Sequence, residues 1–199
     1  MKFNKKIACG ILVLAMVGGL LNTKICNIYA ANKTLDNGEV STMSNTDSIV
    51  QSYYKGQKSG AYKMLQKKIF KKLLTQWVPS DVTNPVYSYS TFSEYHISGS
   101  SKNNLYTCAF TADNGKYGFV VVSYDGQSLS NKGVYITTRL YDLNANISAI
   151  EKKLNNTSIN LSSATASRMR LDGDEVIYFT DSNGQKVVCY LKDLSVEQL

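Results

Sequence analysis

The residue types that most often carry catalysis or bind metals are scarce in this sequence. It has one histidine, His96, and four cysteines, of which Cys108 and Cys189 lie beyond residue 30. A Cys/His nucleophile pair would have to combine His96 with one of these two thiols. Strand alternation places the His96 side chain on the face opposite Tyr95 and Ile97, which indicates an exposed strand residue. No Cys or His spacing typical of a zinc site occurs.

The acidic residues and the glycines form no catalytic or cofactor-binding pattern. Asp172 and Asp174 flank a turn glycine, and Asp181 lies at another turn, where aspartate is common for backbone reasons alone. Hydrolytic carboxylate pairs face each other across a cleft, and turn tips seldom supply one. No glycine-rich loop precedes a helix in a phosphate-binding arrangement. We therefore expect a protein that is not an enzyme, without catalytic residues, cofactor or metal.

The first thirty residues have the order of a secretory signal peptide. Lys2, Lys5 and Lys6 precede an apolar stretch, and the small residue Ala30 ends the segment. The apolar stretch has about fifteen residues, whereas a membrane-spanning helix needs about twenty. We expect cleavage near Ala30 and a secreted or cell-wall-associated product that keeps no transmembrane anchor.

Cleavage would change both the charge and the cysteine content. The segment carries four lysines and no acidic residue, so the formal net charge would fall from +7 to +3. So mild a charge does not predict a nucleic-acid partner. Cys108 and Cys189 would remain, and an oxidising exterior allows a disulfide between them. Each lies mid-strand among apolar residues, where a free thiol behaves as a small hydrophobe, so both alternatives stay open.

The rest of the chain predicts a polar tether over residues 31–46 and a single α+β domain over residues 47–199. A short helix is predicted from Thr46 or Asp47, and apolar residues at steps of three and four predict a helix from Ala61 to Val78. Another helix is predicted over 144–154. Strands joined by hairpin-length turns predict an antiparallel meander packed by the two amphipathic helices. The predicted strands are 86–98, 105–111, 117–124, 133–140, 166–171, 175–180 and 185–191.

The helix over 61–78 carries lysines on a face of their own, at Lys67, Lys68, Lys71 and Lys72. The favoured interpretation is that its apolar side covers the sheet and its lysines are solvated. The alternative is a cell-envelope-associated binding module that uses these lysines against an anionic polymer, a lipid surface or an acidic partner. These four lysines are therefore the candidate partner-binding residues.

One segment is similar to a known family. Asn104-Leu105-Tyr106-Thr107 leads through a turn into Gly118-Phe119-Val120-Val121-Val122-Ser123, and Asp125 follows. This resembles the propeptide of streptopain-type secreted cysteine proteases, over about residues 60–155. Tyr124 stands where that family more often has glycine, and Gly126-Gln127 replaces an acidic–basic cluster.

The resemblance concerns the propeptide alone. The residues after Asn155 contain no histidine, and the family's catalytic domain is not among them. The resemblance therefore implies a stand-alone inhibitor of a secreted cysteine protease, which would fill the protease cleft by apolar burial and main-chain pairing.

Overall fold

A computed structural model describes residues 45–138 and 141–199 of this chain. The predicted signal peptide over residues 1–30 lies outside these residues, as does the predicted tether up to residue 44. Within the described ranges, no helix combines the length and the apolar character needed to cross a membrane.

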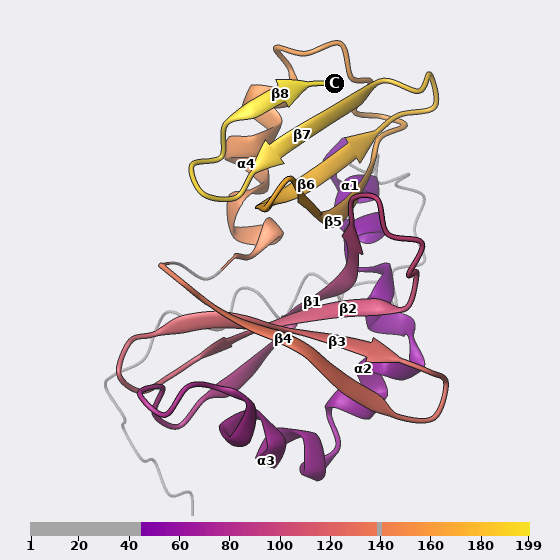
Figure 1. Ribbon diagram of the computed structural model, residues 1–199. Helices are drawn as coiled ribbons and strands as arrows, with labels where there is room; N and C mark the ends of the chain where they lie inside the picture. The colour runs from indigo at the N-terminus through magenta and orange to yellow at the C-terminus, as the bar shows by residue number, and fades with distance from the viewer. Residues whose placement is uncertain (1–44, 139–140) are drawn as a thin grey trace, which may run out of the picture. The chain divides into compact units, whose positions relative to one another are not determined.

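The described residues form helices and one eight-stranded sheet, so the α+β class is confirmed (Figure 1). The strand order is β4-β3-β2-β1-β5-β6-β7-β8. The helical elements are α1 (Asn45–Tyr53), η1 (Lys55–Lys58), α2 (Gly60–Leu65), α3 (Lys68–Trp77) and α4 (Leu143–Leu154). The strands are β1 (Val86–Ile97), β2 (Leu105–Thr111), β3 (Tyr117–Tyr124), β4 (Leu129–Thr137), β5 (Thr165–Leu171), β6 (Asp174–Thr180), β7 (Lys186–Tyr190) and β8 (Val196–Gln198).

The predicted uninterrupted antiparallel meander is not confirmed. The strands form two antiparallel meanders, β1–β4 and β5–β8, which join where β1 pairs in parallel with β5. After the edge strand β4, the chain passes through α4 and returns to the middle of the sheet, where β5 pairs with β1. A tight turn cannot place a strand parallel to its neighbour, so this pairing requires a long connection. The tight turns predicted at 113–115, 125–126, 172–174 and 182–184 each join neighbouring strands of these meanders, whereas strand β8 and its turn after β7 were not predicted. Gly115 and Gly184 adopt the positive φ that Asn-Gly turns use.

The predicted helix over 61–78 is two helices that meet at Gln66 and Lys67. The backbone of Lys67 is extended, with φ −63° and ψ 145°, and it starts α3. Leu65 and Phe70 are both buried, although a spacing of five residues would turn them to different sides of a straight helix. The break lets both side chains reach the sheet, and it leaves Ile69 60% exposed. Ile69 is one of the apolar residues whose spacing predicts a single helix with its apolar side on the sheet, and this prediction is wrong for Ile69.

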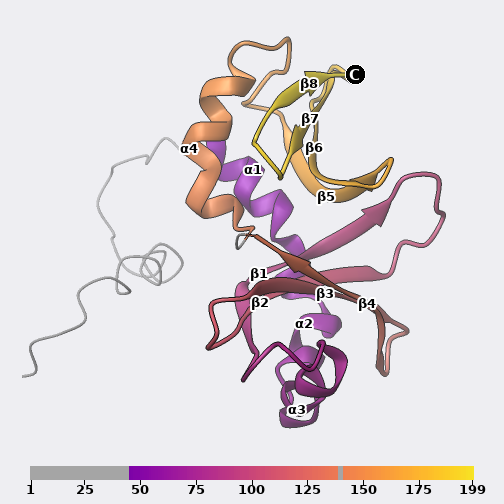
Figure 2. The same ribbon diagram turned by 60° about the vertical axis from the view of Figure 1, so that its left-hand side comes forward.

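The helices cover opposite faces of the sheet. Tyr95 pairs with both Leu105 and Arg168, so these side chains share one face, and Ala166 of β5 lies on it too. On the other face, side chains between the sheet and helices α2 and α3 form an apolar cluster that includes Cys108. α1 and α4 pack against β5–β7 on the first face, in a separate cluster (Figures 1 and 2). We call α2 to β4 the N-terminal half and α4 to β8 the C-terminal half.

Strand β4 forms one edge of the sheet and differs from the predicted strand 133–140. It begins at Leu129, four residues earlier, and residues 139 and 140 lie outside the described part. A register shift beside β3 lets Val121 pair with Gly133 and Val122 with Asn131, so Lys132 lies between two paired residues. A bulge with a lysine is a common feature of strands that end a sheet.

Candidate functional site

The most unusual surface of the molecule is a run of exposed lysines on η1, α2 and α3. Between Ser48 and Ser80 the sequence has seven lysines and no acidic residue, whereas residues 81–199 have ten basic and twelve acidic residues. All seven lysines are exposed. We call this set the cationic surface, and its members are Lys55, Lys58, Lys63, Lys67, Lys68, Lys71 and Lys72.

The sheet fixes α3, the helix that carries three of these seven lysines. Phe70 and Leu74 of α3 are buried against it, and the Tyr87 hydroxyl of β1 donates to the Phe70 carbonyl oxygen at 3.4 Å. Ser59 caps α2, since its hydroxyl oxygen accepts from the Tyr62 backbone N–H at 3.2 Å. The apolar sides of both helices are therefore used inside the protein, and the lysines lie outside.

The four lysines predicted from the sequence lie together on this surface. Lys67 precedes α3, and Lys68, Lys71 and Lys72 follow within its first turns. None of the four forms an ion pair with a carboxylate among residues 45–138 and 141–199. Lys55, in contrast, pairs with Glu94 at 2.9 Å. The positive charge of the four is thus available to an anionic partner.

Tyrosines of β1 and α2 lie beneath α3. The Lys71 Nζ atom is 5.8 Å from the centre of the Tyr89 ring, and Tyr89 in turn contacts the rings of Tyr62 and Tyr87. Burial raises the pKa of Tyr89 to about 12. The tyrosine therefore stays neutral at physiological pH and does not cancel the charge of the lysine above it.

The thiols and the histidine do not form a nucleophilic site. Cys108 and Cys189 are both free and buried, in separate clusters on opposite faces of the sheet, so no disulfide joins them. Burial raises the pKa of Cys108 to about 12 and that of Cys189 to about 11. Activated thiols have a lowered pKa instead. His96 is half-buried on β1, rather than fully exposed.

The aspartates at the turns have structural partners. Asp181 accepts hydrogen bonds from the backbone N–H groups of Asn160, Asn183 and Gln185 at 2.8, 2.9 and 2.9 Å. The Lys192 Nζ atom lies 3.0 Å from a carboxylate oxygen of Asp174. Across the described residues, no group of three or more His, Cys, Asp or Glu side chains is placed to hold a metal ion.

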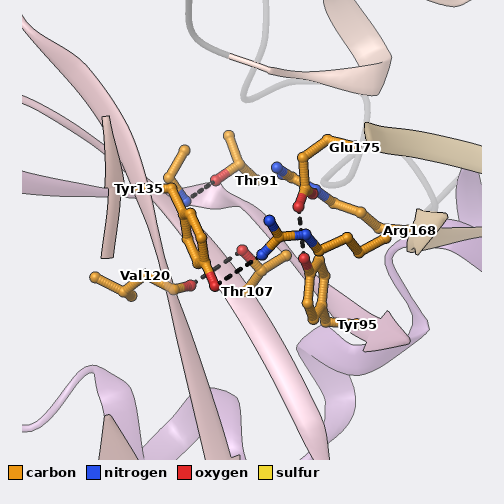
Figure 3. A network of polar contacts seen from close by, with 9 residues as sticks. Thr91, Tyr95, Thr107, Val120, Tyr135, Arg168 and Glu175 are labelled. Carbon is orange, nitrogen blue, oxygen red and sulfur yellow. Dashed lines mark hydrogen bonds and ion pairs between the residues drawn. The ribbon is translucent and has the colours of Figure 1, made fainter. Parts of the chain in front are cut away.

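A buried polar network lies between β1, β5 and β6, and sequence reasoning missed it (Figure 3). Arg168 is 1% exposed, and its Nε atom donates to Glu175 Oε2 at 3.3 Å. The Tyr95 hydroxyl donates to Glu175 Oε1 at 2.5 Å. Burial, with a further contribution from Glu175, raises the pKa of Tyr95, so it remains a hydroxyl donor. The available signal was alternation, which puts Arg168 on the same strand face as the buried Ala166.

Comparisons of this chain with family models, with curated proteins and with solved structures find no match. The similarity of residues 60–155 to streptopain-type propeptides therefore stays a prediction from the sequence.

Proposed function

We propose that this chain is an exported, non-enzymatic binding domain that attaches to an anionic polymer of the cell envelope. The observation that supports this most directly is the cationic surface, where seven exposed lysines follow one another without an intervening acidic residue. The remaining charges of the domain nearly balance, so the positive potential is concentrated on η1, α2 and α3.

A polymer fits this surface better than a lipid bilayer does. A helix that lies in a membrane interface buries a broad apolar face among the lipids. In α3 that face is already occupied, because Phe70 and Leu74 pack against the sheet. Ile69 is the one large apolar side chain of α3 that is mostly exposed. A single isoleucine supplies too little apolar area for insertion.

Several weak contacts would give useful affinity together. One exposed ion pair contributes about 0–1 kcal/mol. A polymer with regularly repeated phosphate or carboxylate groups can contact several lysines at once, and each contact raises the effective concentration for the next. Such binding is predicted to weaken as salt screens the charges.

The test is cosedimentation with purified cell walls, before and after removal of their anionic polymers. The variant changes Lys67, Lys68, Lys71 and Lys72 together to Gln. The matched control changes four exposed lysines elsewhere to Gln, with the same loss of charge: Lys102, Lys132, Lys152 and Lys186. We expect the first variant to bind at least about tenfold more weakly, while the control stays near wild type. Equal loss in both, or binding that persists at high salt, contradicts the proposal.

A second candidate function is inhibition of a secreted cysteine protease. It is supported by the segment that resembles the propeptides, since residues 60–155 include the helix-covered sheet β1–β4 with β4 at its edge. An edge strand can pair with an extended segment of another protein. The test adds the full chain to a streptopain-type protease. Slower turnover supports this function, and unchanged turnover at micromolar inhibitor rejects it. The lysine variant should inhibit as well as wild type, which separates the two candidates.

A further inference from the structure

The two halves of the sheet share a short boundary. β1 and β5 have three register pairs, Tyr95↔Arg168, His96↔Met169 and Ile97↔Arg170. The antiparallel pairing of β2 with β3 has seven. Apolar packing does not bridge the halves uniformly, because the cluster below α2 and α3 and the cluster beside α4 lie on opposite faces. Backbone pairing at the boundary is therefore limited.

Arg168 places a buried charge at this boundary. A charge removed from water must be compensated by nearby groups. The guanidinium carbon lies 4.3 Å from the centre of the Phe119 ring and 5.6 Å from that of Tyr141. Glu175 supplies the negative charge, at 3.3 Å from Nε. Among the described residues the Nη2 atom has no hydrogen-bond partner, so the compensation depends on these few contacts.

The contacts of this network cross from one half to the other. Arg168 and Glu175 belong to the C-terminal half, on β5 and β6, whereas Phe119 and Tyr95 belong to the N-terminal half. Glu175 accepts from Arg168 through one oxygen and from Tyr95 through the other. Tyr95 is 1% exposed and the Glu175 side chain 16% exposed, so the carboxylate is bound through both oxygens and is largely shielded from bulk water.

We infer that Arg168, Glu175 and Tyr95 act as a latch that makes the two halves unfold as one unit. Removing Arg168 takes away its contact with the Phe119 ring across the boundary and leaves the Glu175 carboxylate without its countercharge. The hydrogen bond from Tyr95 to this uncompensated carboxylate and three parallel register pairs then remain to hold the halves together. The halves then open at different denaturant concentrations. This role concerns coupling between the halves and is independent of the cationic surface. A buried ion pair does not by itself imply greater stability, because apolar replacements are often as stable.

The chain has a natural reporter in each half. Cys108 is buried in the cluster of the N-terminal half, and Cys189 in that of the C-terminal half. The experiment exposes the full chain to a urea series, applies a short alkylation pulse and quantifies the two cysteine-containing peptides separately by mass spectrometry. In the wild type both thiols are expected to become reactive at the same urea concentration. In Arg168→Met we expect two midpoints that differ by about 1 M urea or more.

Two further variants make the result decisive. Arg170→Met is the matched control, because Arg170 lies two residues along β5 and also contacts the N-terminal half, through a hydrogen bond of 3.1 Å to Tyr135 of β4. Arg170 is half-buried and is not part of the Arg168–Glu175–Tyr95 network, so this control separates the network from any other contact across the boundary. Its midpoints should coincide. Tyr95→Phe removes one hydroxyl and keeps the ring, so we expect it to separate the two urea midpoints to a smaller extent. If Arg168→Met does not fold, Tyr95→Phe serves as the test of the inference. Coincident midpoints in the latch variants, separated midpoints in the wild type, or equal separation in Arg170→Met would overturn the inference.

Discussion

Tyr54 and Asp142 are 88 residues apart in the sequence, and the Tyr54 hydroxyl donates to Asp142 Oδ1 at 2.8 Å. The same hydroxyl oxygen accepts from the Leu143 backbone N–H at 3.1 Å, while Asp142 Oδ1 accepts from the Asn144 N–H at 3.0 Å. Asp142 is the N-cap of α4. A side chain that follows α1 therefore completes the cap of α4 and joins the two helices that cover β5–β7.

Replacement of Tyr54 by Phe should destabilise the protein by about 1–3 kcal/mol, because it leaves the buried Leu143 N–H without a partner and removes one of the two hydrogen bonds that Asp142 Oδ1 accepts. Urea unfolding followed by circular dichroism measures the change. The control is Tyr190→Phe, which removes an exposed hydrogen bond to Glu197 of 2.7 Å. Its cost should stay within about 0.5 kcal/mol, as for most surface substitutions. Equal losses of unfolding free energy in the two variants would show that the Tyr54 hydroxyl contributes no more to stability than an exposed tyrosine hydroxyl does.

Alkaline conditions should weaken the fold through the buried thiols. Burial raises the pKa of Cys108 to about 12 and of Cys189 to about 11, above the ordinary 9.0. Both thiols keep their protons in the folded protein while the unfolded chain loses them. The free energy of unfolding is therefore expected to decline as the pH rises above about 9. Urea midpoints between about pH 8 and pH 9.5 measure this, and a Cys108→Ala, Cys189→Ala variant should show a shallower decline. A midpoint that rises with pH in this interval contradicts the prediction.

Acid should weaken the turn region around Asp181. Backbone N–H donors, chiefly that of Asn160, hold the pKa of Asp181 below its ordinary 3.8. A lowered native pKa means that the carboxylate stabilises the fold above the unfolded value and that this contribution is lost as the pH falls through the native value. Asp181→Asn should therefore be less stable at neutral pH and less sensitive to acid than wild type. Asp172→Asn, at an exposed turn, is the control and should keep the acid sensitivity of the wild type.

The sequence predicts those parts of the fold that local patterns encode. Turn residues such as Asn114-Gly115 and Asn183-Gly184 separate most strands within each meander, and the observed hairpins have these turns, whereas the short strand β8 was not predicted. Pairing of β1 with β5 has no local signal, because about seventy residues separate the two strands and either could have been an edge. The break between α2 and α3 could have been predicted from the spacing of the apolar residues, since Leu65 and Phe70 cannot share one face of a straight helix.

The exposed lysines could be predicted because, like the turns, they are encoded by a local sequence pattern. Exposed charge on a helix follows from periodicity, so Lys67, Lys68, Lys71 and Lys72 could be named from the sequence. The latch could not be, although alternation from Ala166 shows that Arg168 points inward. Its partners lie on other strands, and only the register of the assembled sheet brings them together.

The close packing of β3 between its neighbours gives a sharp prediction at Gly118. A Cβ atom there would meet the Tyr135 carbonyl oxygen at 2.5 Å and would also overlap the ring of Phe110, which is fully buried. Neither group has room to move, because Gly118 pairs with β2 on one side and β4 on the other. Gly118→Ala should therefore cost about 1–3 kcal/mol or more by overpacking, measured by urea unfolding. The control is Gly99→Ala, where φ is +75° and no atom lies within 4 Å of the added Cβ, so the cost should be backbone strain alone, about 1 kcal/mol. A Gly118→Ala protein as stable as wild type would mean that β3 and Tyr135 are packed less tightly than described.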